Sequence, residues 1–319
     1  MSDRRRVNGP SGGTIPPTPL PSPEGRTQRS RKPNQLRNIY LQTGTIPAAS
    51  GSAYYELEAP ASNNALVPTT STIKLSCAIH GPKPLPRNSN FSPNLQLNAS
   101  VKYAPFATRV RRGYIRDPTE RDLGVHLENA LKGLIIPDRW PKSSIDVAVT
   151  VLEGEDNEDT FPGQSLGSVA AQVGLMNILA GCITVATAAL LDARIDSLDM
   201  MTGGVAASVA APGPTTIRVL DPSATEHESF QAACAVGYLP GRDEVTEVWT
   251  TGVTSEKAQS NVSGFDELLD SAVGAAKAVH AVLNEVIRES ASRQSEVSSG
   301  KIKGKSAMND EMNDIEMKT

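Results

Sequence analysis

The sequence predicts a single α+β domain of layered sheets and helices, with a disordered tail at each end. Two observations indicate the fold class: several β-rich segments precede the first helical pattern, and this order of strands followed by a helix occurs twice. Elements segregated in this way are typical of α+β domains rather than doubly wound ones. A third observation sets the boundaries. Residues 1–35 and 292–319 carry too little apolar surface to fold, which leaves residues 36–291 for the domain.

The composition indicates a soluble, intracellular protein. The chain has 319 residues, of which 39% are hydrophobic, and a formal net charge of −4, so any nucleic-acid or membrane partner must be argued from local features. Cys77, Cys182 and Cys234 form no C-x-x-C pair and are expected to be free thiols. The longest apolar run, AGCITVATAALL, is expected to be too short and too rich in alanine to span a bilayer, and the N-terminus lacks an apolar signal core.

The two tails differ in character. The N-terminal tail is basic and rich in proline and glycine, and its charged clusters at residues 4–6 and 26–32 are expected to be solvated. Nuclear import or the tethering of RNA is the alternative role for these clusters. The tail from residue 292 onward is polar and is likewise expected to be disordered.

The domain opens with four β-rich segments, at residues 37–46, 51–59, 71–82 and 94–105. Apolar residues alternate with polar ones along them, most clearly in STIKLSCAIHGP. Four such segments in succession predict an antiparallel meander.

The period then changes from two to 3.6 in DPTERDLGVHLENALKGLI, which predicts a helix. Asp117 or Thr119 can cap this helix, and Pro118 suits its first turn. Leucines and an alanine form one apolar stripe along it. His126 lies on or beside that stripe, which favours a packing role over metal ligation.

The second half repeats the order of strands and helices. SSIDVAVTVLEGE predicts a strand, and the segment 165–193 predicts a long helix rich in small residues. Four further strand patterns follow between residues 199 and 252, and the segment 263–291 predicts a final amphipathic helix. The glycines of TGGVAASVAAPG match no phosphate-loop motif, so close packing explains them better.

Several blocks of the sequence resemble the ribonuclease PH family. They are LRNIYLQTGTIPAASGSAYYELE, TIKLSCAIHGPKPLPR, VKYAPFATRV, TERDLGVHLENAL, SSIDVAVTVLEGE, AALLDARIDSLDMMTGGVAA and VTEVWTTG. No single block is a sharp motif, but their shared order and spacing are specific. Within the family, the diverged blocks, the acidic insertion and the tails most resemble a ring subunit of the eukaryotic exosome, in particular a fungal one.

This resemblance implies the fold of that family, which is similar to the second domain of ribosomal protein S5. It also implies a ring of such domains around a channel that threads RNA for 3′-to-5′ processing and decay. The implied partners are other ribonuclease PH-like ring subunits, RNA-binding cap subunits and RNA, with no membrane. The implied locations are nucleus, nucleolus and cytoplasm. No cofactor and no metal ion is expected, because the acidic residues of the chain lack calcium-loop spacing.

Active members of the family cleave the terminal nucleotide with inorganic phosphate, and the resemblance implies that this chain has lost the necessary groups. Glu120 stands in place of the first arginine of a catalytic pair, so that only Arg121 is left. The segment Asn177, Ile178 and Leu179 replaces a Gly-Ser-Arg phosphate loop. Ala211 or Pro212 stands where the catalytic aspartate is expected. The sequence therefore predicts a non-catalytic subunit, and phosphorolysis by a rearranged site is the alternative.

Two basic segments are candidates for contact with RNA. In ATRVRRGYIRDPTERDLG, an arginine loop is formed by Arg109, Arg111, Arg112 and Arg116. Arginine grips phosphate oxygens without regard to base sequence, but the acidic surface of a neighbouring subunit would satisfy the same charges. A third alternative is a solvated loop neutralised by nearby acids. The loop HGPKPLPRNS presents Lys83 and Arg87, and the resemblance implies that it lines the channel entrance.

Overall fold

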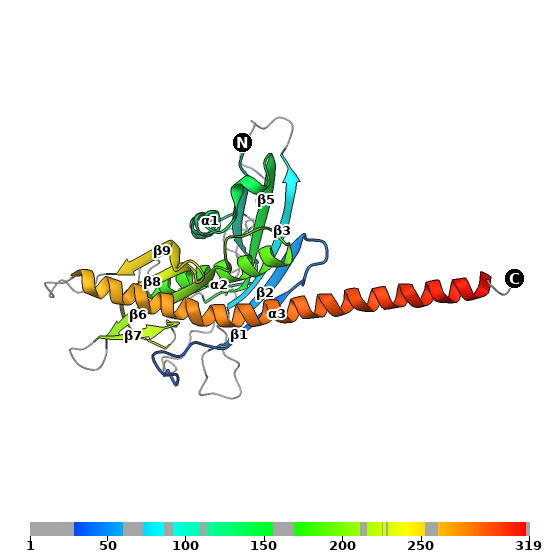
Figure 1. Ribbon diagram of the computed structural model, residues 1–319. Coiled ribbons are helices and arrows are strands. Elements are labelled where there is room, and N and C mark those ends of the chain that lie inside the picture. The colour runs from blue at the N-terminus through cyan, green and yellow to red at the C-terminus, as the bar shows by residue number, and fades with distance from the viewer. Residues whose placement is uncertain are drawn as a thin grey trace, which may run out of the picture.

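The computed structural model of the chain describes residues 29–316, apart from residues 60–72, 86–91, 109–112, 114, 156–168, 211–215, 225, 228 and 253–260. Within these residues the chain forms two β-sheets and three α-helices (Figure 1). The α+β class predicted from the sequence is confirmed.

The first sheet has five strands in the order β1-β2-β3-β5-β4. Their bounds are β1 Ile39–Thr43, β2 Gly51–Leu57, β3 Ile73–Pro84, β4 Gln96–Tyr103 and β5 Ser143–Glu153. The strands β1, β2 and β3 form the expected antiparallel meander. The fourth strand departs from it, because β4 pairs with β5 in parallel and not with β3. The helix α1 lies between β4 and β5 in the chain, and a helical crossover of this kind joins parallel strands.

The second sheet is antiparallel throughout, with the order β7-β6-β8-β9. Its strands are β6 Thr202–Ala210, β7 Thr216–Leu220, β8 Phe230–Leu239 and β9 Glu244–Gly252. Two glycines of β6 allow neighbouring helices to approach closely. A Cβ atom added to Gly203 would lie 2.3 Å from the carbonyl oxygen of Ala180, and one added to Gly204 would lie 2.3 Å from that of Ala272. The close-packing role predicted for TGGVAASVAAPG is therefore confirmed for these two residues.

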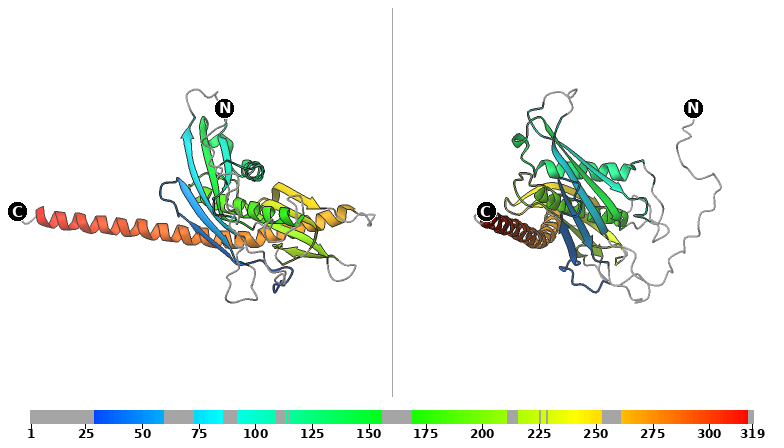
Figure 2. Two further views of the ribbon diagram at one scale, coloured as in Figure 1. Left: turned by 180° about the vertical axis from the view of Figure 1, so that it is seen from behind. Right: turned by 90° about the vertical axis from the view of Figure 1, so that its right-hand side faces the viewer.

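The helices are α1 Pro118–Lys132, α2 Val169–Asp192 and α3 Asn261–Glu316, and a short 3₁₀ helix spans Pro137–Arg139. The helix α2 packs against strands of both sheets, and α3 covers the other face of the second sheet and reaches β1 (Figures 1 and 2). Since α2 is buried on nearly every side, it needs no polar face. By length and composition α2 could cross a membrane, contrary to our expectation, but 89% of its most apolar window is buried inside the protein.

Both predicted tail boundaries need correction. The helix α3 does not end near residue 291 but continues to Glu316, so that it projects well beyond the body (Figure 1). Its last part contains no proline, so no residue there blocks a helical backbone, although Gly300 and Gly304 do not favour one. At the other end, Arg29 and Arg31 form ion pairs with Asp221 and Glu226 and so belong to the folded domain. Residues 1–28 and 317–319 lie outside the described residues.

Candidate functional site

A cluster of charged and polar side chains lies buried where the two sheets approach α2. It consists of Arg37, Glu155, Asn177, Asp221 and Ser223, which we call the buried ion cluster. Arg37 precedes β1, Glu155 follows β5, and Asn177 belongs to α2, while the other two follow β7. The fold thus brings together residues from four distant parts of the chain.

The guanidinium of Arg37 is the centre of the cluster. Its Nη2 and Nε atoms donate to the two carboxylate oxygens of Asp221 at 2.6 and 2.8 Å, which is a bidentate pair. Its Nη1 atom donates to Glu155 Oε1 at 3.2 Å. The Asn177 amide donates to Glu155 Oε2 at 2.8 Å, and the Ser223 hydroxyl donates to Glu155 Oε1. The two buried carboxylates are therefore compensated within the protein.

The electrostatics of this pair favour the charged forms of both partners. Burial alone would raise the pKa of Asp221, but the charge and hydrogen bonds of Arg37, together with the charge of Arg31, hold that pKa well below its usual value. Burial alone would lower the pKa of Arg37, but the two carboxylates raise it. Because its donors are bonded to these carboxylates, Arg37 offers no free guanidinium to a phosphate group.

The residues that the resemblance aligns with a phosphate loop lie inside α2. Asn177 is buried, and its amide also donates to the carbonyl oxygen of Pro222 at 2.7 Å. Ile178 and Leu179 are buried in the hydrophobic core. At these positions the chain therefore has a packed helix, and the acidic insertion before it falls largely outside the described residues.

Glu120 has a structural role at the start of α1. Its side chain is buried, and its carboxylate accepts the backbone N–H of Tyr103 at 2.8 Å and that of Asp117 at 3.1 Å. Asp117 is the N-cap and Pro118 lies in the first turn, as predicted. The spacing Asp-x-x-Glu before an apolar stripe is a capping-box signal that could have indicated this role from the sequence. Arg121, the next residue, is exposed.

Of the residues proposed to touch RNA, the structure describes Lys83 and Arg116. Arg116 is exposed just before α1. Lys83 lies near the end of β3, where its ammonium group pairs with Asp146, and Asn98 donates to the same carboxylate at 2.9 Å. The hydrogen bond from Lys83 is the main reason that the pKa of Asp146 is lowered. Arg87, Arg109, Arg111, Arg112, Ala211 and Pro212 lie outside the described residues.

Comparison with known protein families decides the family of the chain. The model of the 3′ exoribonuclease family, domain 1, which represents the ribonuclease PH family, matches residues 35–196. This chain belongs to the ribonuclease PH family. The matched region begins just before β1 and extends beyond α2, so it contains Arg37, Glu120, Glu155 and Asn177.

Relatives of this ribonuclease PH family chain are named as exosome components. The exosome complex component MTR3 of Chaetomium thermophilum is 47% identical over 293 residues, which cover 91% of this chain and 99% of the relative. The corresponding protein of Schizosaccharomyces pombe is 31% identical and covers 80% of this chain and 86% of the relative. These findings confirm the predicted resemblance, including its fungal character.

Among solved structures, rice Rrp46 superposes with a TM-score of 0.57. The match covers 81% of this chain and 98% of the rice protein at 17% sequence identity, so it supports the shared fold alone. The expected ribonuclease PH-like fold is confirmed.

Two histidines show what sequence patterns can and cannot indicate in this ribonuclease PH-like domain. His126 packs as predicted: its ring stacks on that of Trp249 with centroids 4.8 Å apart, and its Nδ1 atom lies 2.6 Å from Glu247 Oε1. His80 has no partner at metal-ligand spacing in the sequence, and in the structure it lies within β3, which continues past it to Pro84. Among the described residues, no group of three or more His, Cys, Asp or Glu side chains could hold a metal ion.

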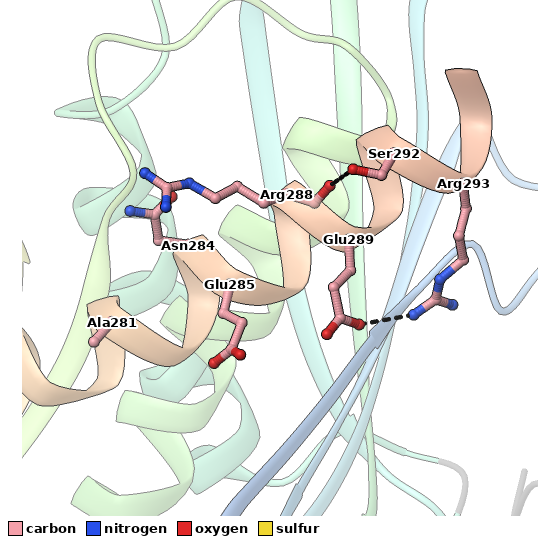
Figure 3. A pocket seen from close by; sticks show the side chains of 7 residues that line it. All are labelled: Ala281, Asn284, Glu285, Arg288, Glu289, Ser292 and Arg293. Carbon is pink, nitrogen blue, oxygen red and sulfur yellow. Dashed lines mark hydrogen bonds and ion pairs between the residues drawn. The ribbon is translucent and has the colours of Figure 1, made fainter. Parts of the chain in front are cut away.

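A hollow of about 620 Å³ lies along α3 and is lined by residues of that helix alone (Figure 3). Its side chains are largely charged or polar, and two of them, Glu289 and Arg293, pair with each other at 3.0 Å. No second element contributes a group that could converge on a ligand there. We therefore assign it no catalytic role.

Proposed function

We propose that this chain is a structural ring subunit of an exosome complex, without catalytic activity of its own, that helps to guide RNA during 3′-to-5′ processing and decay. The observation that carries the proposal is the 47% identity, over almost the whole chain, to a protein named exosome complex component MTR3. The partners would be other ribonuclease PH-like ring subunits and RNA-binding cap subunits. The complex would act in the nucleus, the nucleolus and the cytoplasm.

Two local features support the absence of catalysis. A phosphorolytic site must hold the negative charge of phosphate and of the scissile bond, which requires unpaired positive groups. In the buried ion cluster, Arg37 is bonded to two carboxylates, and Glu120 is buried beside Arg121 as part of the helix cap. Next to Arg121, the carboxylate of Glu120 would repel the negative charge that a phosphorolytic site has to stabilise.

The experiment has two parts. The tagged chain, co-expressed with ribonuclease PH-like partners, should appear by native mass spectrometry in a hetero-oligomeric ring. The purified chain should not shorten RNA in a phosphate-dependent manner. Robust phosphate-dependent shortening that Arg121→Ala abolishes would contradict the non-catalytic role, whereas failure to enter a ring would contradict the structural one.

The outer edge of β9 predicts that the chain is poorly soluble when it is produced alone. This strand is at the edge of its sheet and contains neither lysine nor proline, and Val245 and Val248 are 38% and 42% exposed. Co-expression with ring partners should raise the soluble yield by covering this edge. Replacing both valines with lysine should increase the solubility of the chain produced alone, and it should reduce incorporation of the chain into the ring. A stable monomer of the unmodified chain would contradict the prediction.

Release of Lys83 from Asp146 is expected to strengthen RNA binding by the assembled ring. Asp146→Asn removes the charge that neutralises the ammonium group, and an exposed pair of this kind is worth at most about 1 kcal/mol, or about fivefold in affinity. RNA affinity should therefore rise by about twofold to fivefold at low salt. Asp138→Asn, which removes an exposed acid from the short 3₁₀ helix, serves as the control. An unchanged affinity for Asp146→Asn would exclude Lys83 from the RNA path.

A further inference from the structure

The segment of residues 29–37 is held against the turn that follows β7 by arginine side chains. The Arg31 guanidinium donates to both carboxylate oxygens of Glu226, at 2.8 and 2.9 Å, and to Asp221 at 2.9 Å. The Arg29 guanidinium pairs with Glu226 at 3.2 Å. Only 7% of the Arg29 side chain and 13% of the Arg31 side chain are exposed, so these are not solvated surface charges.

Arg29 also folds the segment around its own guanidinium. It donates to the backbone carbonyl oxygens of Lys32, Gln35, Leu220 and Asp221 at 2.9–3.2 Å. The backbone N–H of Leu220 in turn donates to the carbonyl oxygen of Pro33 at 2.9 Å. The segment is therefore bonded to the end of β7 through main-chain as well as side-chain groups.

The buried acidic residues of this contact need the arginines to balance their charge. The Glu226 side chain is 3% exposed and that of Asp221 is 11% exposed. Arg37 compensates Asp221 from the side of the buried ion cluster, but Glu226 is paired with Arg29 and Arg31. A carboxylate as buried as Glu226 is costly to keep charged without a partner. The contact suits an arginine, because the planar guanidinium of Arg31 bridges the two carboxylates, with Nη1 donating to Asp221 and Nη2 to Glu226.

We propose that Asp221 and Glu226 form a binding site for an Arg-x-Arg motif, and that the chain's own Arg29, Ser30 and Arg31 fill this site as an N-terminal latch. The latch ties the start of the domain to the second sheet, next to the buried ion cluster. It also withdraws these arginines from the basic tail, so they are not available as an import signal or an RNA tether while the latch is closed.

Tryptic cleavage of the full-length chain tests the latch. Trypsin can cut after Arg26, which lies outside the described residues, and after Arg29 and Arg31 within the latch. If the latch is closed, cleavage after Arg29 and Arg31 should be at least about tenfold slower than cleavage after Arg26, because cleavage tracks the open population. Mass spectrometry of the N-terminal fragments over time gives all three rates in one reaction.

Variants assign the protection to the ion pairs. Glu226→Gln should bring the rates after Arg29 and Arg31 close to the rate after Arg26, while Glu285→Gln, on the exposed side of α3, should leave them unchanged. Equal rates at Arg26, Arg29 and Arg31 in the unmodified chain would overturn the proposal, even if no variant folds. Protection that persists in Glu226→Gln would also overturn it.

Discussion

Replacement of Arg37 by alanine is expected to lower the free energy of unfolding by about 3–5 kcal/mol, which is the typical cost of removing one partner from a buried ion pair. The Arg37 side chain is 1% exposed, and its guanidinium compensates Asp221 and Glu155, both of which are buried. Without it, these carboxylates would have to be protonated or hydrated for the domain to fold. The drop in unfolding free energy reflects the cost of keeping the two remaining carboxylates desolvated without a partner, rather than the lost attraction of the ion pair.

Urea denaturation of the chain, alone or within the co-expressed assembly, measures this change. Arg139→Ala is a matched control, because Arg139 pairs with Asp196 at 2.9 Å but both side chains are largely exposed, at 68% and 45%. Such a pair contributes about 0–1 kcal/mol. The double variant Arg37→Ala with Asp221→Ala should lose less than the sum of the two single changes, since it leaves fewer unpaired charges. A loss below about 1 kcal/mol for Arg37→Ala would contradict the assignment.

The same pair has a pH signature. The folded-state pKa of Asp221 is depressed, so its contribution to stability is fully present above the unfolded pKa of about 3.9 and is lost as the pH falls through that value toward the folded pKa. Asp221→Asn should therefore flatten the acid limb of the curve of unfolding free energy against pH. Equal slopes for the two proteins would contradict the depressed pKa.

Local patterns predicted the elements of this fold well. Along β3, Ile73, Leu75, Cys77 and Ile79 are all fully buried, as their alternation indicated. The strand that pairs with β4 could not be predicted from alternation. Alternation shows which side chains face the core but not which strand lies beside them. The extent of α3 was also missed. Its apolar stripe ends where the body ends, whereas the helical backbone continues.

The polar interior was harder to predict than the hydrophobic one. The buried ion cluster draws on separate segments, since Arg37 is 118 residues from Glu155 and 184 residues from Asp221 along the chain. Each member alone is an ordinary polar residue beside a strand or within a helix. Arg29 and Arg31 stand in a stretch whose composition is that of a tail, and their order depends on acids that lie far along the chain. Long-range pairing of this kind has no short sequence signature. Glu120 is different, because its spacing of three residues from Asp117 is a local signal from which its capping role could have been predicted.

Alanine replacement of Arg109, Arg111, Arg112 and Arg116 together is expected to weaken RNA binding by the assembled ring and to flatten its dependence on salt. Each lost contact between an arginine and a phosphate should reduce the slope of log affinity against log salt by about 0.7 for single-stranded RNA. If all four touch RNA, the slope should fall by about 3. Because phosphate contacts carry no base information, the loss should be uniform across RNA sequences.

The opposite outcome distinguishes contact with RNA from contact with a neighbouring subunit. If the arginines pair with acids of a neighbour, the quadruple variant should yield rings that dissociate more readily, while RNA affinity per intact ring and its salt slope stay unchanged. Arg121→Ala is the matched control, since Arg121 is an exposed arginine of the same region that stands between Glu120 and Asp122. Its removal should cost little in RNA affinity. The deciding measurement is a salt titration of RNA affinity on rings whose integrity has been checked by native mass spectrometry. An unaltered slope on intact rings would exclude the arginine loop from the RNA path. Readier dissociation of those rings at high salt would then assign the loop to a contact between subunits rather than to a solvated surface.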